Sequence, residues 1–155
     1  MKNTIRFLAV LFAAISLSVL LCQFFEWPVK TSLSKDDYLV EQKLFNSLSW
    51  VYFIEFLALL HTLVLVLLER KKKRTFVLLL IALVFFIISI VIFFIFTLPT
   101  DIATSSWSML PDNWESLRDQ WEDSIVWRAL INLTGFSFLV LAMLRNRYYY
   151  RQDFV

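Results

Sequence analysis

Four long apolar segments alternate with short polar segments along the chain. Residues 7–25 and 76–98 contain no charged side chain, and residues 50–68 and 125–144 are apolar apart from a few polar positions. A helix of about 20 residues, rising 1.5 Å per residue, crosses about 30 Å of hydrocarbon. Because a backbone in lipid must satisfy its own hydrogen bonds, the pattern predicts an all-α, four-transmembrane-helix bundle. We expect residues 1–155 to form a single membrane domain, with helices at about 5–25, 50–69, 75–98 and 112–146.

The polar segment before the last apolar segment has a helical pattern of its own. Pro111 and Asp112 are typical of a helix start. The apolar residues that follow recur at helical spacing: Trp114, Leu117, Trp121 and Ile125. We therefore expect a short outer amphipathic helix that continues into the fourth transmembrane helix. Pro99 is expected to end the third helix.

Composition and charge agree with a membrane location. The chain is 59% hydrophobic and 18% charged, against about 25% charged in soluble domains. Ten Lys and Arg residues flank the apolar segments on one side: Lys2, Arg6, Arg70–Arg74, Arg145, Arg147 and Arg151. Five lie on the other side, among ten acidic residues: Lys30, Lys35, Lys43, Arg118 and Arg128. The positive-inside rule then predicts a protein of the plasma (inner) membrane with both termini in the cytoplasm.

The N-terminal segment allows one alternative interpretation. Residues 1–22 have the basic start and apolar middle of a cleaved signal peptide. The apolar run is long and lacks a clear small-x-small cleavage site, so a retained helix is the main prediction. Cys22 is the one cysteine and His61 the one histidine, so we expect no disulfide, no metal and no cofactor. Since no basic patch with interleaved aromatic residues occurs, the expected partners are the lipid bilayer and a lipophilic small molecule, not nucleic acid.

Ionisable residues inside a membrane are costly and mark candidate sites. Glu55 lies about 7.5 Å below the outer end of its helix, and Arg128 lies about 4.5 Å below the outer end of its own. We predict a polar cluster in the outer half of the bundle, with an ion pair between these two residues at its centre. The cluster, structural or ligand-binding, comprises Gln23, Glu26, Glu55, Arg128 and Asn132. Further candidates are His61, Lys30, Trp107, Arg118, Trp121 and Glu122, and no catalytic residue is assigned.

Two stretches resemble a family of small four-helix membrane proteins, a domain of unknown function that includes the fungal anthrone oxygenases. The first is Glu26-Trp27-Pro28-Val29-Lys30, similar to the family's Glu-Leu-Pro-x-Lys. The second comprises Pro99, Trp107, Leu110-Pro111-Asp112-Asn113-Trp114, Leu117-Arg118 and Gln120-Trp121-Glu122. The resemblance implies the four-helix architecture and oxidation or binding of a lipophilic aromatic compound. Two histidines of the family are replaced here by Gln23 and Ile125, so the resemblance does not extend to chemistry that rests on those histidines.

Three functional hypotheses remain open. The first is a membrane protein with an outward-facing intramembrane polar site that binds a lipophilic ligand. The second is an anthrone-oxygenase-like oxidoreductase acting on a lipophilic aromatic compound, which would need a closed aromatic pocket beside Glu55. The third is a small proton-coupled transporter, in which Glu55 would be free of Arg128. If the cluster is only a structural clamp, we expect tight packing and no cavity.

Overall fold

The computed structural model describes residues 2–46 and 50–152 of the chain. It is all-helical, with no strand among those residues. The elements in chain order are α1 (Lys2–Lys30), α2 (Lys35–Asn46), α3 (Val51–Leu68), α4 (Lys73–Ile92), the π-helical turn η1 (Phe93–Thr97), α5 (Leu98–Ala103) and α6 (Trp114–Gln152). Four stretches are long and apolar enough to cross a membrane: Lys2–Lys30, Val51–Leu68, Lys73–Ala103 and Trp114–Arg145. The four predicted apolar helices are therefore confirmed.

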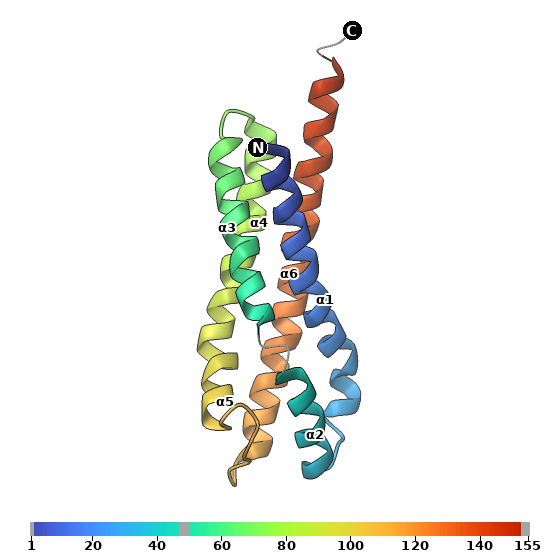
Figure 1. Cartoon of the computed structure of the whole chain (residues 1–155), viewed down its shortest axis with the longest axis vertical. Helices are drawn as coiled ribbons and strands as arrows, with labels where there is room; N and C mark the ends of the chain where they lie inside the picture. Colours follow the sequence, from blue (N-terminus) through green and yellow to red (C-terminus); the bar gives the residue numbers. More distant parts are fainter. Residues whose placement is uncertain (1, 47–49, 153–155) are drawn as a thin grey trace.

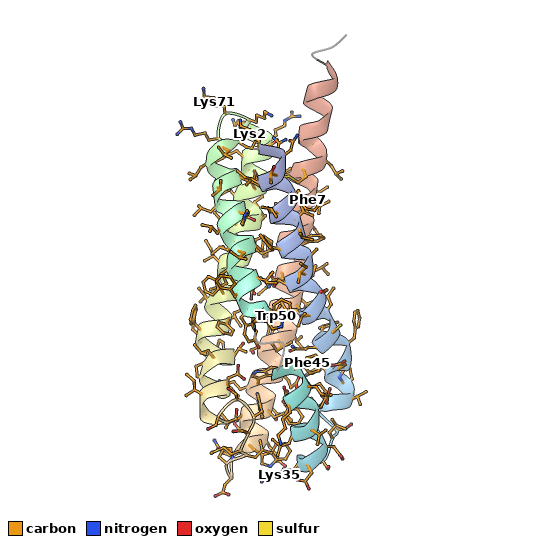
Figure 2. All side chains as sticks on the ribbon, in the orientation of Figure 1. Lys2, Phe7, Lys35, Phe45, Trp50 and Lys71 are labelled. Carbon is orange, nitrogen blue, oxygen red and sulfur yellow. The ribbon has the colours of Figure 1, made fainter. Side chains whose placement is uncertain are left out.

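The four long helices lie side by side along the long axis of the molecule (Figure 1). α1 packs against α3 and α6, and α4 packs against α6 and α3. The start of α1 and the end of α6 lie at one end of the molecule, together with Lys2 and Lys71, and we call this the basic end (Figures 1 and 2). Lys35 lies at the opposite end, which we call the α2 end. The shorter helix α3 begins well below the basic end, and α1, α4–α5 and α6 extend beyond it (Figure 1). There α2 contacts α1 and α6.

Two apolar cores hold these helices together. Small side chains line the core between α1, α3, α4 and α6, including Ala9, Ala13, Ala58, Ala82 and Ala142. Gly135 on α6 lies so close to α4 that an added Cβ atom would approach Phe86 to 3.0 Å. Small residues of this kind allow close contact between helices where lipid provides no hydrophobic driving force. The second core lies at the α2 end and comprises Leu20, Tyr38, Trp107, Trp121, Ile125 and Ala129.

The first helix is longer than the sequence predicted, and it includes Pro28. The first helix was expected to end near residue 25, but α1 continues through Pro28 to Lys30. A proline lacks an N–H group and disfavours a helix interior. Here it stands in the last turn, where only a few residues follow. The extension brings the Lys30 side chain into the protein interior, where it is 1% exposed.

The expectation that Pro99 ends the third helix was also wrong. The helical path runs from Lys73 to Ala103 by way of the π-helical turn η1, with Pro99 in the first turn of α5. A π-helical turn widens the backbone, which accommodates a proline that an uninterrupted α-helix would exclude. The carbonyl oxygen of Phe96 accepts hydrogen bonds from Thr100 Oγ1 at 2.9 Å and Gln120 Nε2 at 3.2 Å. These side chains satisfy the backbone near the break.

The prediction that the outer amphipathic segment continues into the last long helix is confirmed. α6 is one helix from Trp114 to Gln152. It begins two residues later than predicted, because residues 112–113 form a turn. Trp121 and Ile125 of the apolar stripe are 2% and 1% exposed, so the stripe faces the protein interior.

Candidate functional site

The predicted ion pair between Glu55 and Arg128 is present and deeply buried. Arg128 Nη2 on α6 donates to Glu55 Oε2 on α3 at 2.6 Å. The other carboxylate oxygen accepts hydrogen bonds from Ser89 Oγ on α4 at 2.7 Å and Asn132 Nδ2 on α6 at 3.1 Å. All four side chains are at most 4% exposed. We call these residues the ion-pair cluster, and they join α3, α4 and α6.

The guanidinium group of Arg128 has further partners. Its Nη1 donates to Thr97 Oγ1 in η1 at 3.4 Å. Its carbon atom lies 5.0 Å from the ring centre of Phe93 and 5.3 Å from that of Tyr52, within the range of cation–π attraction. Removing one member of such a buried pair leaves an uncompensated charge and costs about 3–5 kcal/mol. The ion-pair cluster is thus a strong connection between helices.

A second polar cluster lies at the α2 end around Lys30 and Glu122. Lys30 Nζ at the end of α1 lies 3.1 Å from Glu122 Oε1 on α6. Tyr38 of α2 donates to the same oxygen at 3.0 Å, and Gln42 Nε2 donates to Tyr38 Oη at 2.7 Å. Burial, and then the negative charge of Glu122, raise the pKa of Tyr38 far above its ordinary value, so its hydroxyl stays protonated and can donate. We call these four residues the Lys30 cluster.

Aromatic rings surround the buried ammonium group of Lys30. Its Nζ lies 4.8 Å from the ring centre of Phe45, 5.0 Å from that of Trp121 and 5.8 Å from that of Tyr38. The ring faces and the Glu122 carboxylate together compensate the charge. This enclosure ties α2 to α1 and α6.

The connection between α5 and α6 is anchored by a tryptophan pair. Asp101 Oδ1 accepts hydrogen bonds from the indole nitrogens of Trp107 and Trp121, each at 3.1 Å. Ser105, Ser106 and Trp107 have φ angles of 49°, 58° and 58°. A left-handed backbone costs roughly 1–2 kcal/mol per residue. The burial of the Trp107 side chain and its bond to Asp101 offset this strain.

The interior beside the ion-pair cluster is tightly filled. A cavity of about 20 Å³ is lined by Ser16, Val19, Leu20, Gln23, Phe45, Val51, Tyr52, Glu55 and Arg128. A neighbouring cavity of about 10 Å³ is lined by Gln23, Gln42, Phe45, Tyr52, Asp101, Trp107 and Trp121. One water molecule needs a cavity volume of about 10–15 Å³. Neither cavity has room for a drug-sized molecule, which needs about 300 Å³ or more.

A larger space lies on the surface between α1 and α2. This groove has a volume of about 630 Å³ and is lined by Phe25, Glu26, Val29, Lys30, Leu33, Asp37, Val40, Glu41 and Leu44. Most of its rim is apolar, and four of its apolar side chains are between 64% and 72% exposed: Phe25, Val29, Val40 and Leu44. Charged groups lie between these side chains. We call it the α1–α2 groove.

The structure separates the predicted site residues into distinct places. Glu55, Arg128 and Asn132 meet in the ion-pair cluster. Gln23 borders the two cavities, and Glu26 lines the α1–α2 groove instead of meeting Glu55. The tryptophan and Glu122 candidates lie in the clusters of the α2 end: Trp107, Trp121 and Glu122, with Lys30.

Two candidate residues lie apart from both clusters. His61 Nδ1 lies 2.7 Å from the carbonyl oxygen of Leu57 on the same helix, and its ring packs 5.1 Å from that of Phe12 on α1. This hydrogen-bond contact of His61 therefore stays within α3, and its ring contact with Phe12 connects α3 to α1. Arg118 pairs with its neighbour Asp119 at 2.9 Å on the surface.

Sequence reasoning missed Ser89, Tyr38, Gln42 and Asp101. Ser89 is the one polar side chain between Phe76 and Phe96, and an isolated hydroxyl on such an apolar helix was a usable signal. Asp101 follows Pro99, where the third helix was expected to end, so the sequence pattern predicts a loop at this position. Tyr38 and Gln42 lie four residues apart on α2 and gave no distinctive pattern.

A third polar group lies at the basic end. Arg6 on α1 donates a hydrogen bond to Glu69, which follows α3, and Lys72 Nζ lies 3.4 Å from the same carboxylate. Burial alone would raise the pKa of Glu69, but the hydrogen bond and charge of Arg6, with the charge of Lys72, hold it below its ordinary value. This group connects α1 to the turn between α3 and α4.

Within the described part of the chain, no three His, Cys, Asp or Glu side chains are arranged to hold a metal ion. Comparisons with models of known protein families, with curated proteins and with solved structures gave no match. The family resemblance noted in the sequence therefore remains a prediction.

Proposed function

We propose that this chain is a four-transmembrane-helix bundle of the plasma (inner) membrane that binds an amphipathic small molecule on its outer side. The α2 end would face outward, and both termini would lie in the cytoplasm. The four apolar helices and the concentration of Lys and Arg at the basic end support this orientation.

The α1–α2 groove is the observation that carries the binding proposal. Its volume of about 630 Å³ lies in the range of about 300–1,000 Å³ typical of ligand sites. Exposed apolar side chains such as Val29 and Val40 form its rim, and carboxylates lie among them. An amphipathic molecule would place its hydrocarbon part on the rim and its head group beside the charges.

The charges of the groove favour a cationic head group. Glu26 Oε2 and Glu41 Oε2 are buried atoms with no hydrogen-bond partner among the described residues. Lys30 is already paired with Glu122. Burial, and to a lesser degree the negative charge of Glu26, raise the pKa of Glu41, while the charge of Lys30 opposes this effect. An ammonium group would supply the missing donors and relieve the repulsion between the two carboxylates.

The ion-pair cluster supports a structural role in this proposal. Both oxygens of the Glu55 carboxylate already accept hydrogen bonds. A proton-coupled carboxylate would need to be released from Arg128, and an oxidoreductase would need space for an aromatic substrate beside Glu55. The cavity of about 20 Å³ beside Glu55 is too small for such a substrate, and Glu55 is bonded to Arg128. We therefore propose the cluster as the clamp that holds α3, α4 and α6 in place beneath the ligand site.

Photo-crosslinking in bilayers tests the binding proposal. The full chain in phosphatidylglycerol nanodiscs, which contain no ammonium lipid, is labelled with a dodecylammonium probe that carries a diazirine near its head. Matched dodecyl sulfate and dodecanol probes serve as comparisons. Labelling of the groove peptides is divided by labelling of α4, which corrects for partition of each probe into the bilayer.

We expect the ammonium probe to give the highest ratio of groove labelling to α4 labelling. In the Glu26→Gln/Glu41→Gln double variant this ratio should fall about tenfold or more, because charge-assisted hydrogen bonds contribute about 1.5–3 kcal/mol each. Asp36→Asn is the matched control, since Asp36 is exposed on α2 and does not line the groove. Equal ratios for all three probes would contradict the cationic head group, and no labelling of the groove above α4 would contradict the site itself.

A further inference from the structure

Two buried polar atoms on different helices lack a partner within the protein. Gln23 on α1 is 4% exposed, and its Oε1 atom has no hydrogen-bond partner among the described residues. Arg128 on α6 is fully buried, and its Nε atom also lacks a partner, although both terminal nitrogens are engaged. A buried polar group without a partner costs about 1–3 kcal/mol. Buried groups of this kind are normally satisfied by protein or by ordered water.

The two atoms belong to residues that line the same cavity. That cavity measures about 20 Å³, and its polar lining residues are Ser16, Gln23, Tyr52, Glu55 and Arg128. A single water molecule needs about 10–15 Å³ and two to four polar partners. One of the atoms is a donor and the other an acceptor, so they are chemically complementary to one water. The adjoining cavity of about 10 Å³ is at the lower limit for a water molecule.

We propose that the larger cavity is a binding site for one ordered water molecule that bridges Arg128 and Gln23. The water accepts a hydrogen bond from Arg128 Nε and donates one to Gln23 Oε1. Its second hydrogen is directed towards Glu55, Ser16 or Tyr52, which line the same cavity. Among the described residues, no direct hydrogen bond joins α1 to the ion-pair cluster. The water therefore connects α1 to the clamp between α3, α4 and α6. This inference is independent of the α1–α2 groove.

Solid-state NMR of the full chain in lipid bilayers tests the proposal. The protein is labelled with ¹⁵N-arginine and ¹⁵N-asparagine, and magnetisation is transferred from water to the side-chain N–H groups. The Arg128 Nε resonance is identified by its loss in Arg128→Lys. The side-chain amide of Asn132 is the internal reference, because it donates directly to Glu55, Ser89 and the Arg128 carbonyl and lines neither cavity.

We expect several-fold faster transfer to Arg128 Nε than to the Asn132 amide in the wild type. In Gln23→Met, which keeps the side-chain length but removes the acceptor, the Arg128 transfer should fall to the Asn132 level. Glu115→Met, at an exposed position near the start of α6, is the control and should leave it unchanged. Wild-type transfer no faster than at Asn132 would overturn the water site. Fast transfer that persists in Gln23→Met would overturn the bridge to Gln23.

Discussion

Arg128 Nη2 and Glu55 Oε2 lie 2.6 Å apart, and both side chains are almost completely removed from solvent. This contact joins α6 to α3, and the two residues are 73 positions apart in the sequence. Ser89 and Asn132 donate hydrogen bonds to the other oxygen of the carboxylate, Oε1. The arrangement fixes the relative rotation of three helices at one level.

The first prediction concerns the two halves of this pair. Glu55→Leu and Arg128→Leu should each lower the free energy of unfolding by about 3–5 kcal/mol, because each leaves a buried charge without its partner. The double variant should be less destabilised than the sum of the two single variants, since no unpaired charge remains. Reversible unfolding in mixed micelles measures all three. A double variant as unstable as the sum would show that the two residues do not act as a unit.

This variant pair also separates the clamp from the ligand site. If the double variant folds, crosslinking of the dodecylammonium probe in the α1–α2 groove should stay within about twofold of the wild type, since neither residue lines the groove. A specific loss of groove labelling by the folded variant would contradict a purely structural role.

The left-handed backbone before α6 gives a second prediction. Ser105 has a φ angle of 49° and its side chain is exposed. Ser105→Gly should stabilise the protein by up to about 1 kcal/mol, because glycine removes the left-handed penalty but loses more entropy on folding. Ser105→Ala keeps the Cβ atom and is the matched control, with no stabilisation expected. Thermal unfolding of both variants in the same detergent compares them. Equal effects of glycine and alanine would mean that this backbone is not strained.

The Arg6–Glu69 contact predicts a stability change with pH. The pKa of Glu69 is held below its ordinary value of 4.5 in the folded protein. The contribution of Glu69 is therefore complete above the unfolded-state pKa and is lost as pH falls through the lower folded-state pKa. Stability measured from about pH 6 to about pH 3 should decline less steeply in Glu69→Gln than in the wild type. The exposed Glu115→Gln should retain the wild-type slope, and a Glu69→Gln curve parallel to the wild type would contradict the prediction.

The groove carboxylates predict the pH dependence of ligand binding. The pKa of Glu41 is raised above its ordinary value of 4.5, so this carboxyl group becomes neutral at a higher pH than a free glutamate. Crosslinking by the dodecylammonium probe should therefore weaken on acidification at a pH above the ordinary glutamate pKa of 4.5. Glu41→Gln should remove this step and leave a weaker binding that varies less with pH. A probe that binds equally across this range would exclude a role for Glu41 in recognising the head group.

The sequence determined the features that depend on position along a single helix. Runs of apolar residues predicted four long helices, because crossing hydrocarbon needs about 20 apolar residues in succession. The constant rise of the helix placed Glu55 and Arg128 at similar depth, so their contact could be predicted before any packing was known. The continuous path through Trp121 into the last helix followed from the helical spacing of its apolar side chains.

Only the tertiary structure decided which polar groups meet and where space remains. Lys30 appeared as a loop lysine, but α1 extends past Pro28 and inserts it beside Glu122 and three aromatic rings. Ser89 joins Glu55 because of the rotation of α4, which its apolar sequence does not specify. The larger groove lies between α1 and α2 rather than at the buried charges, since Tyr52, Phe93 and Thr97 surround Arg128. Hydropathy and helical spacing describe one helix at a time, whereas these contacts depend on the shapes of several helices packed together.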